Sequence, residues 1–339
     1  MATVAVSDAR AAAVAPNRFD YLLERIRSAP FVETPFRHIE IFDFLAEEHF
    51  AAIIGSEQIA LTSSKTTEAL LNRLGESGYE PIPFPGCVTS EAEYLDWFHG
   101  RTKKSYHAAT EGFGIVYRLT KFRDSLLSEL DDFFHSEALS AVMREKFEID
   151  RPVSLDGGIQ KYLHGYEISP HPDIRRKALT WMLNINPGVG AETADYHTHY
   201  LRLKDQWKFI SEFWKHNEGV DRDWLPWDWC DTVKRQPKNN SIVIFQPEND
   251  TIHAVKANYD HLPTQRTQLY GNLWYELVKL PNLPHQEFRL VERAKPPQSF
   301  VDRLRDASAT QALKASPVGS ILRTLKPKTE KKHVRKVDF

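Results

Sequence analysis

The spacing of apolar residues along the chain changes its period near residue 150. Before that point apolar residues recur at helical intervals, which predicts helices at 19–26, 45–54, 66–74, 91–98, 122–134 and 138–147. After it, runs rich in β-branched and aromatic residues alternate with Gly, Pro and Asn, which predicts strands at 158–163, 177–185, 197–203, 241–245, 251–255 and 267–278. Two further strands are expected at 38–44 and 112–119. Many short strands are typical of a sandwich or a jelly roll, so we expect an α+β protein whose N-terminal helices pack outside one β domain.

Composition indicates a soluble, folded protein. Of the 339 residues, 41% are hydrophobic and 12% are aromatic, too many for a wholly disordered chain. No apolar run approaches the ~20 residues of a membrane-spanning helix, and the first 16 residues lack the pattern of a secretory signal. The two cysteines, Cys87 and Cys230, cannot form a disulfide framework or a four-thiolate zinc site. We therefore expect a protein of a reducing compartment, specifically the cytoplasm.

Charge argues against nucleic acid as a partner. The 44 Lys and Arg residues nearly balance the 46 Asp and Glu residues, and the formal net charge is −2. Residues 323–339 are an exception because basic residues outnumber acidic ones there. A solvated tail and a docking segment for an acidic partner or a membrane surface are both open. The sequence does not define the oligomeric state.

The candidate chemistry centres on His171-Pro172-Asp173. Prolines at 170 and 172 favour extended backbone in the residues that precede them, and in extended chain residues i and i+2 point to the same side. His253 lies on a predicted strand further along the chain. One imidazole, a carboxylate two residues later and a distant second imidazole make a 2-His-1-carboxylate set. Such a set occupies one face of an iron ion and leaves positions open for other ligands.

These motifs, in this order, resemble the Fe(II)/2-oxoglutarate-dependent dioxygenases, and their prolyl-4-hydroxylase-like branch in particular. QKYLHGYEISPHPD (160–173) is similar to that branch's Tyr-rich strand leading into His-x-Asp, and RRKALTWMLNINPG (175–188) to the strand that follows. IHAVKA (252–257) resembles the strand of the distal histidine, and RTQLYGNLWY (266–275) the strand whose basic residue holds the cosubstrate. HIEIFDFLAEEHFAAII (38–54) is similar to the opening strand and helix.

The resemblance implies a double-stranded β-helix, a cupin-like jelly roll, and a role for each matched residue. Fe(II) would be bound by His171, Asp173 and His253. The far carboxylate of 2-oxoglutarate would pair with Arg266, whose guanidinium offers two parallel donors, and Tyr162 would donate its phenol to the same cosubstrate. Asp173 occupies the position where related halogenases lack a carboxylate, which favours hydroxylation. An unactivated C–H bond would be oxidised by O2 while 2-oxoglutarate is converted to succinate and CO2.

The sequence departs from the family pattern at two places. The gap from His253 to Arg266 is longer than is usual in the family, and segment 188–204 replaces a Gly-Gly motif. We expect a flexible N-terminus at 1–17, an oxygenase domain at 18–290 and a basic C-terminal extension at 291–339. The domain would comprise a helical part (18–150), a jelly-roll part (112–278) and a Trp-rich insertion (205–235).

The substrate region is predicted around this insertion, which holds five of the eight tryptophans and lies between the two halves of the iron triad. It is longer than a plain connection, so a lid that stacks on substrate and a helical insertion with its own core are both open. We expect substrate contacts from Arg175, Trp181, His199 and Trp227. The substrate would be a small molecule or carbohydrate. A prolyl-type hydroxylase of protein side chains and a cupin-like binding protein without turnover are the alternatives.

Overall fold

The computed structural model describes residues 17–84, 87–102 and 112–276. These residues belong to one unit, which spans Met1–Leu277. The predicted flexible N-terminus, apart from Asn17, and the basic extension at 291–339 lie outside the described residues, as does the end of the predicted oxygenase domain. Within the described ranges, none of the helices has the length and apolarity to cross a membrane.

The helical part of the chain agrees closely with the periodicity of the sequence. The α-helices are α1 (Tyr21–Ser28), α2 (Glu47–Gly55), α3 (Thr67–Glu76), α4 (Glu91–Phe98), α5 (Ser125–Phe134), α6 (Glu137–Lys146) and α7 (Phe209–His216). Three short 3-10 helices are η1 (Ala191–Thr193), η2 (Asp205–Trp207) and η3 (Trp227–Trp229). Most α-helices begin where a side chain accepts a backbone N–H, as Ser136 does from Leu139 at the start of α6.

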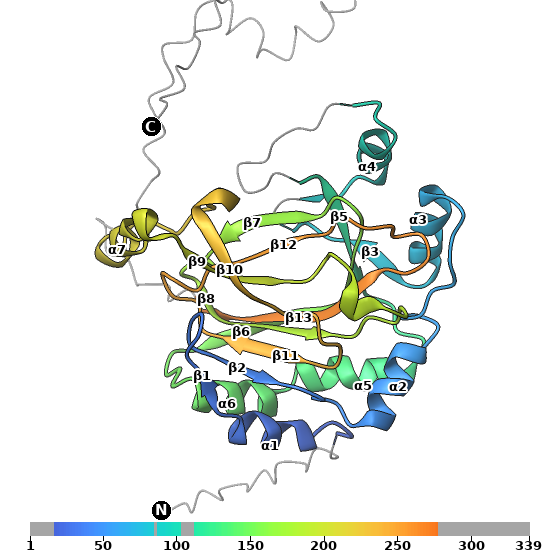
Figure 1. Ribbon diagram of the computed structural model, residues 1–339. Helices are drawn as coiled ribbons and strands as arrows, with labels where there is room; N and C mark the ends of the chain where they lie inside the picture. Colours follow the sequence, from blue (N-terminus) through green and yellow to red (C-terminus); the bar gives the residue numbers. More distant parts are fainter. Residues whose placement is uncertain (1–16, 85–86, 103–111, 277–339) are drawn as a thin grey trace, which may run out of the picture. The chain divides into compact units, whose positions relative to one another are not determined.

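The strands form two sheets. They are β1 (Phe31–Val32), β2 (His38–Ile41), β3 (Tyr79–Pro81), β4 (Cys87–Val88), β5 (Gly114–Leu119), β6 (Val153–Tyr162), β7 (Glu167–His171), β8 (Lys177–Asn184), β9 (His199–Leu203), β10 (Cys230–Arg235), β11 (Ile242–Phe245), β12 (His253–Lys256) and β13 (Arg266–Tyr275). The nine-stranded sheet has the order β1-β2-β11-β8-β13-β6-β5-β3, with β4 added beside β5, and the four-stranded sheet has the order β10-β9-β12-β7 (Figure 1).

Mixed helices and antiparallel sheet confirm the predicted α+β class. Within the described ranges, all strand pairs are antiparallel except that of β4 with β5. Of the eight strands from β6 onward, four enter the large sheet and four the small one, so the chain crosses repeatedly between them. β10 was predicted as part of the Trp-rich insertion, but it is an edge strand of the small sheet, paired with β9. The remainder of the insertion contains η2, α7 and η3.

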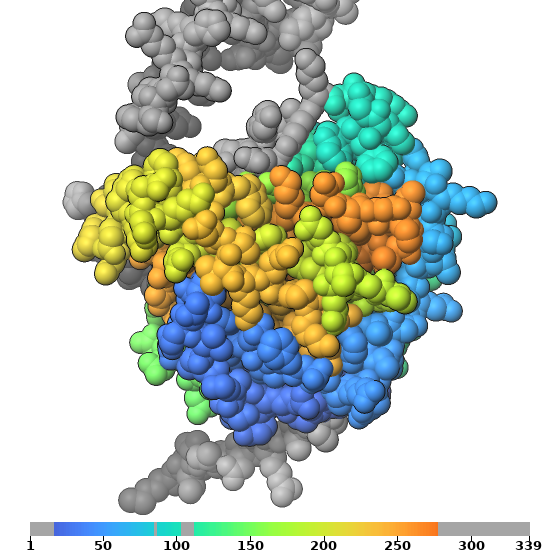
Figure 2. Space-filling model, in the orientation of Figure 1, coloured from blue at the N-terminus to red at the C-terminus, as the bar shows by residue number. Residues whose placement is uncertain are grey.

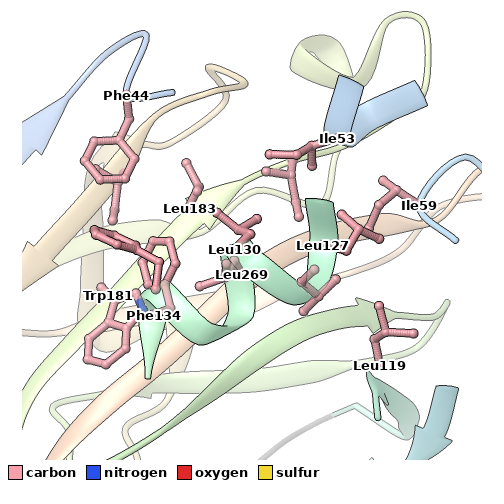
Figure 3. Close-up of a cluster of buried hydrophobic side chains, with 14 of the residues drawn as sticks. Phe44, Ile53, Ile59, Leu119, Leu127, Leu130, Phe134, Trp181, Leu183 and Leu269 are labelled. Carbon is pink, nitrogen blue, oxygen red and sulfur yellow. The ribbon is translucent and has the colours of Figure 1, made fainter. Parts of the chain in front are cut away.

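The main hydrophobic core lies between the large sheet and the helices. Figure 3 shows Leu127, Leu130 and Phe134 of α5 among side chains of β8 and β13, and all three are buried. Burying one such side chain contributes ~1.5–3 kcal/mol, and α5 alone buries five residues. The expectation that N-terminal helices pack outside the sheet therefore agrees with this arrangement.

Strand alternation gives the large sheet a second, polar face. Along β13, Leu269 and Leu273 enter the core, whereas Arg266, Gln268, Tyr270, Asn272 and Trp274 line a cavity on the other side. This follows from the two-residue period of a strand. The sheet thus separates the hydrophobic core from a cavity lined by polar and aromatic residues.

Candidate functional site

Three residues predicted from the sequence converge at the cavity. His171 ends β7 and His253 begins β12, and these antiparallel strands place the two residues opposite each other, with ring centroids 4.5 Å apart. Asp173 follows β7 and lies between them, 3.8 Å from His171 Nε2 and 3.9 Å from His253 Nε2 through its two oxygens. One ligand atom from each residue lies within 4.8 Å of the others, and all three residues are buried. This spacing suits a shared metal ion.

Backbone carbonyls orient both imidazoles. His171 Nδ1 lies 2.8 Å from the Ser169 carbonyl and His253 Nδ1 lies 3.1 Å from the Thr251 carbonyl. Donation from Nδ1 leaves each Nε2 as an acceptor toward the centre of the group. Burial, with His171 adjacent, lowers the pKa of His253 to about 4. His253 is therefore neutral at pH 7, the form that binds metals.

Two neighbouring side chains hold the Asp173 carboxylate. Lys177 Nζ donates to Oδ1 at 2.6 Å, and Thr180 Oγ1 donates to Oδ2 at 2.5 Å. Burial opposes ionisation of Asp173, but the Lys177 ammonium beside it holds the pKa of Asp173 well below the usual range. Lys177 Nζ also contacts the Tyr270 hydroxyl at 2.9 Å. Asp173 is therefore an oriented anion in the buried site.

Arg266 begins β13 and is only 2% exposed. Its Nη2 donates to Gln268 Oε1 at 2.8 Å and to Thr198 Oγ1 at 3.2 Å, and its guanidinium lies 4.4 Å from the centroid of the Tyr162 ring. Nη1 is buried and has no hydrogen-bond partner among the described residues. A buried cation with an unsatisfied donor requires an acceptor, and this geometry fits a carboxylate. The Tyr162 phenol donates instead to Gln160 Oε1 at 2.7 Å.

The triad, Arg266 and Tyr162 all line one cavity of about 470 Å³. Its remaining walls are largely apolar and include Ile82, Phe84, Ile168, Trp224 and Trp274. Pockets of this kind, apolar with a few convergent polar groups, are typical of small-molecule sites. The structure therefore places a candidate metal group and an unsatisfied cation in the same enclosed space.

The predicted substrate residues do not line this cavity. Trp181 lies in the core on the opposite face of β8, stacked on Phe134 with centroids 6.4 Å apart. Trp227 packs edge-on against His199 at 5.5 Å, outside the cavity, and donates through Nε1 to Glu167. Trp181 and His199 lie on strands, where alternation decides which face a side chain occupies.

Arg175 has a different role from the predicted one. Its guanidinium donates to the carbonyl oxygens of Trp214, Asn217 and Val220, within and just after α7. It therefore anchors the Trp-rich insertion and does not face the cavity. Figure 2 shows this insertion as a yellow lobe at the left of the molecule. His197 and His199 belong to no metal-binding group of three or more within the described ranges.

The tryptophan of the insertion that reaches the cavity is Trp224. Its ring lies 6.2 Å from that of His171, and its Nε1 is buried with no hydrogen-bond partner among the described residues. The neighbouring Leu225 N–H donates to the Pro170 carbonyl at 2.7 Å, and Arg222 Nη1 to the Asp173 carbonyl at 2.8 Å. The insertion thus contributes a wall beside the triad. Only the unpaired indole distinguishes Trp224 from its neighbours, and sequence does not reveal it.

Comparisons with known proteins find similarity only to solved structures. No family model matches the sequence, and no curated protein matches it significantly. A prolyl-4-hydroxylase from Pseudomonas putida is 12% identical, with 76% of this chain and 100% of that chain covered and a TM-score of 0.37. A prolyl hydroxylase from Trichoplax adhaerens, in complex with a hypoxia inducible factor peptide fragment, is 12% identical over 76% and 88% of the two chains, with a TM-score of 0.36. HygX from Streptomyces hygroscopicus, with nickel and 2-oxoglutarate bound, is 12% identical over 64% and 89%, with a TM-score of 0.28.

Proposed function

We propose that this protein is an Fe(II)- and 2-oxoglutarate-dependent dioxygenase that hydroxylates an unactivated C–H bond of a small molecule or carbohydrate. The observation that carries the proposal is the convergence of His171, Asp173 and His253 in a cavity that also holds Arg266. Two imidazoles and one carboxylate suit Fe(II) and leave part of its coordination sphere open. The unsatisfied Nη1 of Arg266 suits the carboxylate of a cosubstrate.

We interpret strands β6 to β13 as a double-stranded β-helix. β6, β8, β11 and β13 belong to the large sheet, while β7, β9, β10 and β12 belong to the small sheet. In this arrangement β7 and β12 become neighbours although about 80 residues separate them in sequence, and a jelly roll brings distant strands together in this way. The interpretation accounts for the position of a metal site between the two sheets.

The chain's own residues would position the reactants. When bound, Fe(II) and 2-oxoglutarate supply the chemistry by which O2 yields a hydroxylated product, succinate and CO2. Lys177 and Thr180 hold the Asp173 carboxylate, and the Ser169 and Thr251 carbonyls hold the imidazoles. Arg266 would orient the cosubstrate through its far carboxylate. The apolar walls limit the access of water to the reacting groups.

The enclosure of the site supports a small substrate over an extended polypeptide. Arg222 and Trp224, from the insertion, line the cavity on the side of His171, and Ile82 and Phe84 line it as well. Both Arg222 and Leu225 are hydrogen-bonded to the segment 170–173 that carries the metal ligands. A wall that is hydrogen-bonded to the metal-ligand segment favours a small substrate over an extended peptide.

Metal and cosubstrate binding test the proposal directly. The full-length protein should bind one Mn(II) or Fe(II), and then 2-oxoglutarate, in titration calorimetry. It should release succinate with Fe(II), 2-oxoglutarate and O2 in the presence of a suitable substrate. His253→Ala should lose metal binding, because two ligands hold the ion far less firmly than three. His216→Ala is a matched control, since His216 is exposed and begins another His-x-acid pair. Metal binding that survives in His253→Ala would refute the assignment.

A further inference from the structure

The cavity contains a second charged pair, away from the metal group. Arg118 on β5 and Asp156 on β6 form two parallel hydrogen bonds, Nη1 to Oδ1 at 2.9 Å and Nη2 to Oδ2 at 3.4 Å. Both residues line the cavity with the triad. Bidentate pairs of this kind have a defined geometry. The pair therefore presents a guanidinium and a carboxylate side by side on the cavity wall.

A glycine makes room for this arrangement. The Arg118 side chain passes over Gly158, where an added Cβ would lie 3.2 Å from Arg118 Cδ and 3.3 Å from Cγ. Gly158 has φ of +150°, a conformation that side-chain-bearing residues rarely adopt. The guanidinium thereby crosses β6 and reaches Asp156, two residues further along the strand. An ion pair between two exposed side chains would not need a glycine beneath the arginine.

Besides Arg266, Arg118 is a cavity cation with a buried donor that has no hydrogen-bond partner among the described residues. Lys177 is held by Asp173 and Tyr270, and Arg222 donates to the Asp173 carbonyl and the Asn249 amide oxygen. Arg118 Nε, by contrast, is buried without a hydrogen-bond partner among the described residues. The Asp156 side chain is 49% exposed, so its oxygens retain room for further donors.

The position of the pair suits a substrate anchor. Asp156 lies opposite Asn272 in the β6–β13 register. The Thr180 hydroxyl is close both to the amide oxygen of Asn272 and to a carboxylate oxygen of Asp173. Neighbouring strands are about 5 Å apart, so two strand spacings separate Asp156 on β6 from Thr180 on β8 by roughly 10 Å, and the Thr180 hydroxyl contacts the Asp173 carboxylate. A molecule held at the pair would therefore present to the metal a carbon several bonds away from its anchored end.

We propose that Arg118 and Asp156 bind the carboxylate and the ammonium group of a zwitterionic, amino-acid-type substrate whose apolar side chain extends toward the metal group. This inference rests on the proposed function and names the substrate class. A lone anion beside Arg118 would be repelled by Asp156, and a lone cation beside Asp156 by Arg118. A zwitterion satisfies both, and the apolar walls at Phe84 and Trp274 suit its side chain. Residues within a polypeptide lack both free charges.

Titration calorimetry with matched probes tests this inference. The full-length protein, with Mn(II) and 2-oxoglutarate present, is titrated with leucine, isoleucine, methionine and phenylalanine, and with the N-acetyl and amide derivatives of each. At least one amino acid should bind more tightly than both of its derivatives, by roughly tenfold to a hundredfold, because each derivative loses a charge-assisted contact. If every derivative binds as tightly as its parent, or if no amino acid binds, the inference is overturned.

Variants then assign the contact. Arg118→Gln should weaken binding of the amino acid roughly tenfold or more, and Asp156→Asn should erase its advantage over the N-acetyl derivative. That advantage is the ratio of the affinities for the amino acid and for its N-acetyl derivative, measured on one preparation. Partial unfolding of a variant lowers both affinities equally, so it does not change the ratio. Lys121→Gln is the control, since Lys121 forms an exposed pair with Glu80 near the same β3–β5 edge. An unchanged ratio in Asp156→Asn would overturn the assignment.

The two proposals fail separately in this design. The Arg118–Asp156 pair belongs to the protein itself, so titrations without metal should show the same preference for the zwitterion. Amino-acid binding without metal or 2-oxoglutarate binding would refute the dioxygenase proposal and leave the anchor standing. Metal and 2-oxoglutarate binding without any amino-acid binding would refute the anchor and leave the dioxygenase proposal standing.

Discussion

Replacing Arg266 with alanine should weaken the binding of 2-oxoglutarate and leave metal binding nearly unchanged. The guanidinium contacts Thr198, Gln268 and the Tyr162 ring and none of the three candidate metal ligands. Its loss therefore removes the partner of the far carboxylate of the cosubstrate without altering the metal group. This separation of roles makes the variant informative.

The size of the effect follows from the donors that Arg266 has free. Nη2 is already shared by two oxygen acceptors, so Nη1 is left as the buried donor for the carboxylate. Removing one partner of a buried, hydrogen-bonded charge pair costs about 2–5 kcal/mol. With one free donor we expect a value near the middle, about 3 kcal/mol, which is a factor of roughly 100 in Kd. Arg266→Lys should lose less, because lysine keeps the charge and loses the planar geometry.

The assay is titration of 2-oxoglutarate into the Mn(II)-loaded variant, with Mn(II) binding measured first on the same sample. Lys256→Ala serves as the control, since Lys256 is a strand cation near the site, on β12, but is exposed and paired with Glu167. Circular dichroism melting of each variant checks that the fold persists. An unchanged Kd for 2-oxoglutarate in a folded Arg266→Ala protein would refute the assignment of the cosubstrate to this residue.

Three further outcomes are expected. Lys177→Met should weaken Mn(II) binding in calorimetry, since the Asp173 carboxylate loses the ammonium that orients it; equal affinity would contradict that role. Burial lowers the pKa of Lys161 to about 7, well below its value in an unfolded chain, so the unfolded state binds more protons between pH 7 and 10 and the protein should gain stability there as pH rises. Denaturant unfolding should show this gain relative to Lys161→Met, and a constant difference would contradict it. Deleting residues 323–339 should leave succinate release unchanged, because so charged a segment buries little surface; a large loss of rate would show that the tail takes part in the site.

Local patterns in the sequence were sufficient to predict most elements and the convergence of His171 and Asp173, whereas His253 was added by the order of motifs and the resemblance. The helical periods of α5 and α6 and the same-side geometry of His171 and Asp173 are local properties, and the structure retains them. β7 was indicated by the resemblance and by the extended backbone expected before Pro170 and Pro172, since its sequence EISPH lacks the alternation of a strand. Periodicity alone therefore identified long elements better than short ones, as expected when tertiary pairing decides short strands.

Longer-range relations could not be predicted in the same way. Lys177 was not among the predicted site residues, and a register shift between Leu273 and Trp274 in the facing strand accompanies its turn toward the cavity. Arg118 and Asp156 lie 38 residues apart and meet only through the β5–β6 pairing. Trp181 occupies space left by Gly271, where a Cβ would lie 2.2 Å from the indole. None of these contacts has a signature within a single segment of sequence.

The attachment of the Trp-rich insertion bears on how readily the protein can change its specificity. Arg175 binds the insertion through the carbonyls of Trp214, Asn217 and Val220, and the Leu225 N–H binds the Pro170 carbonyl. Backbone groups accept all of these bonds, so substitutions among the side chains of the insertion would not remove them. Mutations at Trp224 and Leu225 can therefore accumulate during evolution, or in a laboratory library, while these backbone bonds persist. The side chains of this cavity wall can therefore change one at a time while the backbone of the insertion keeps its position.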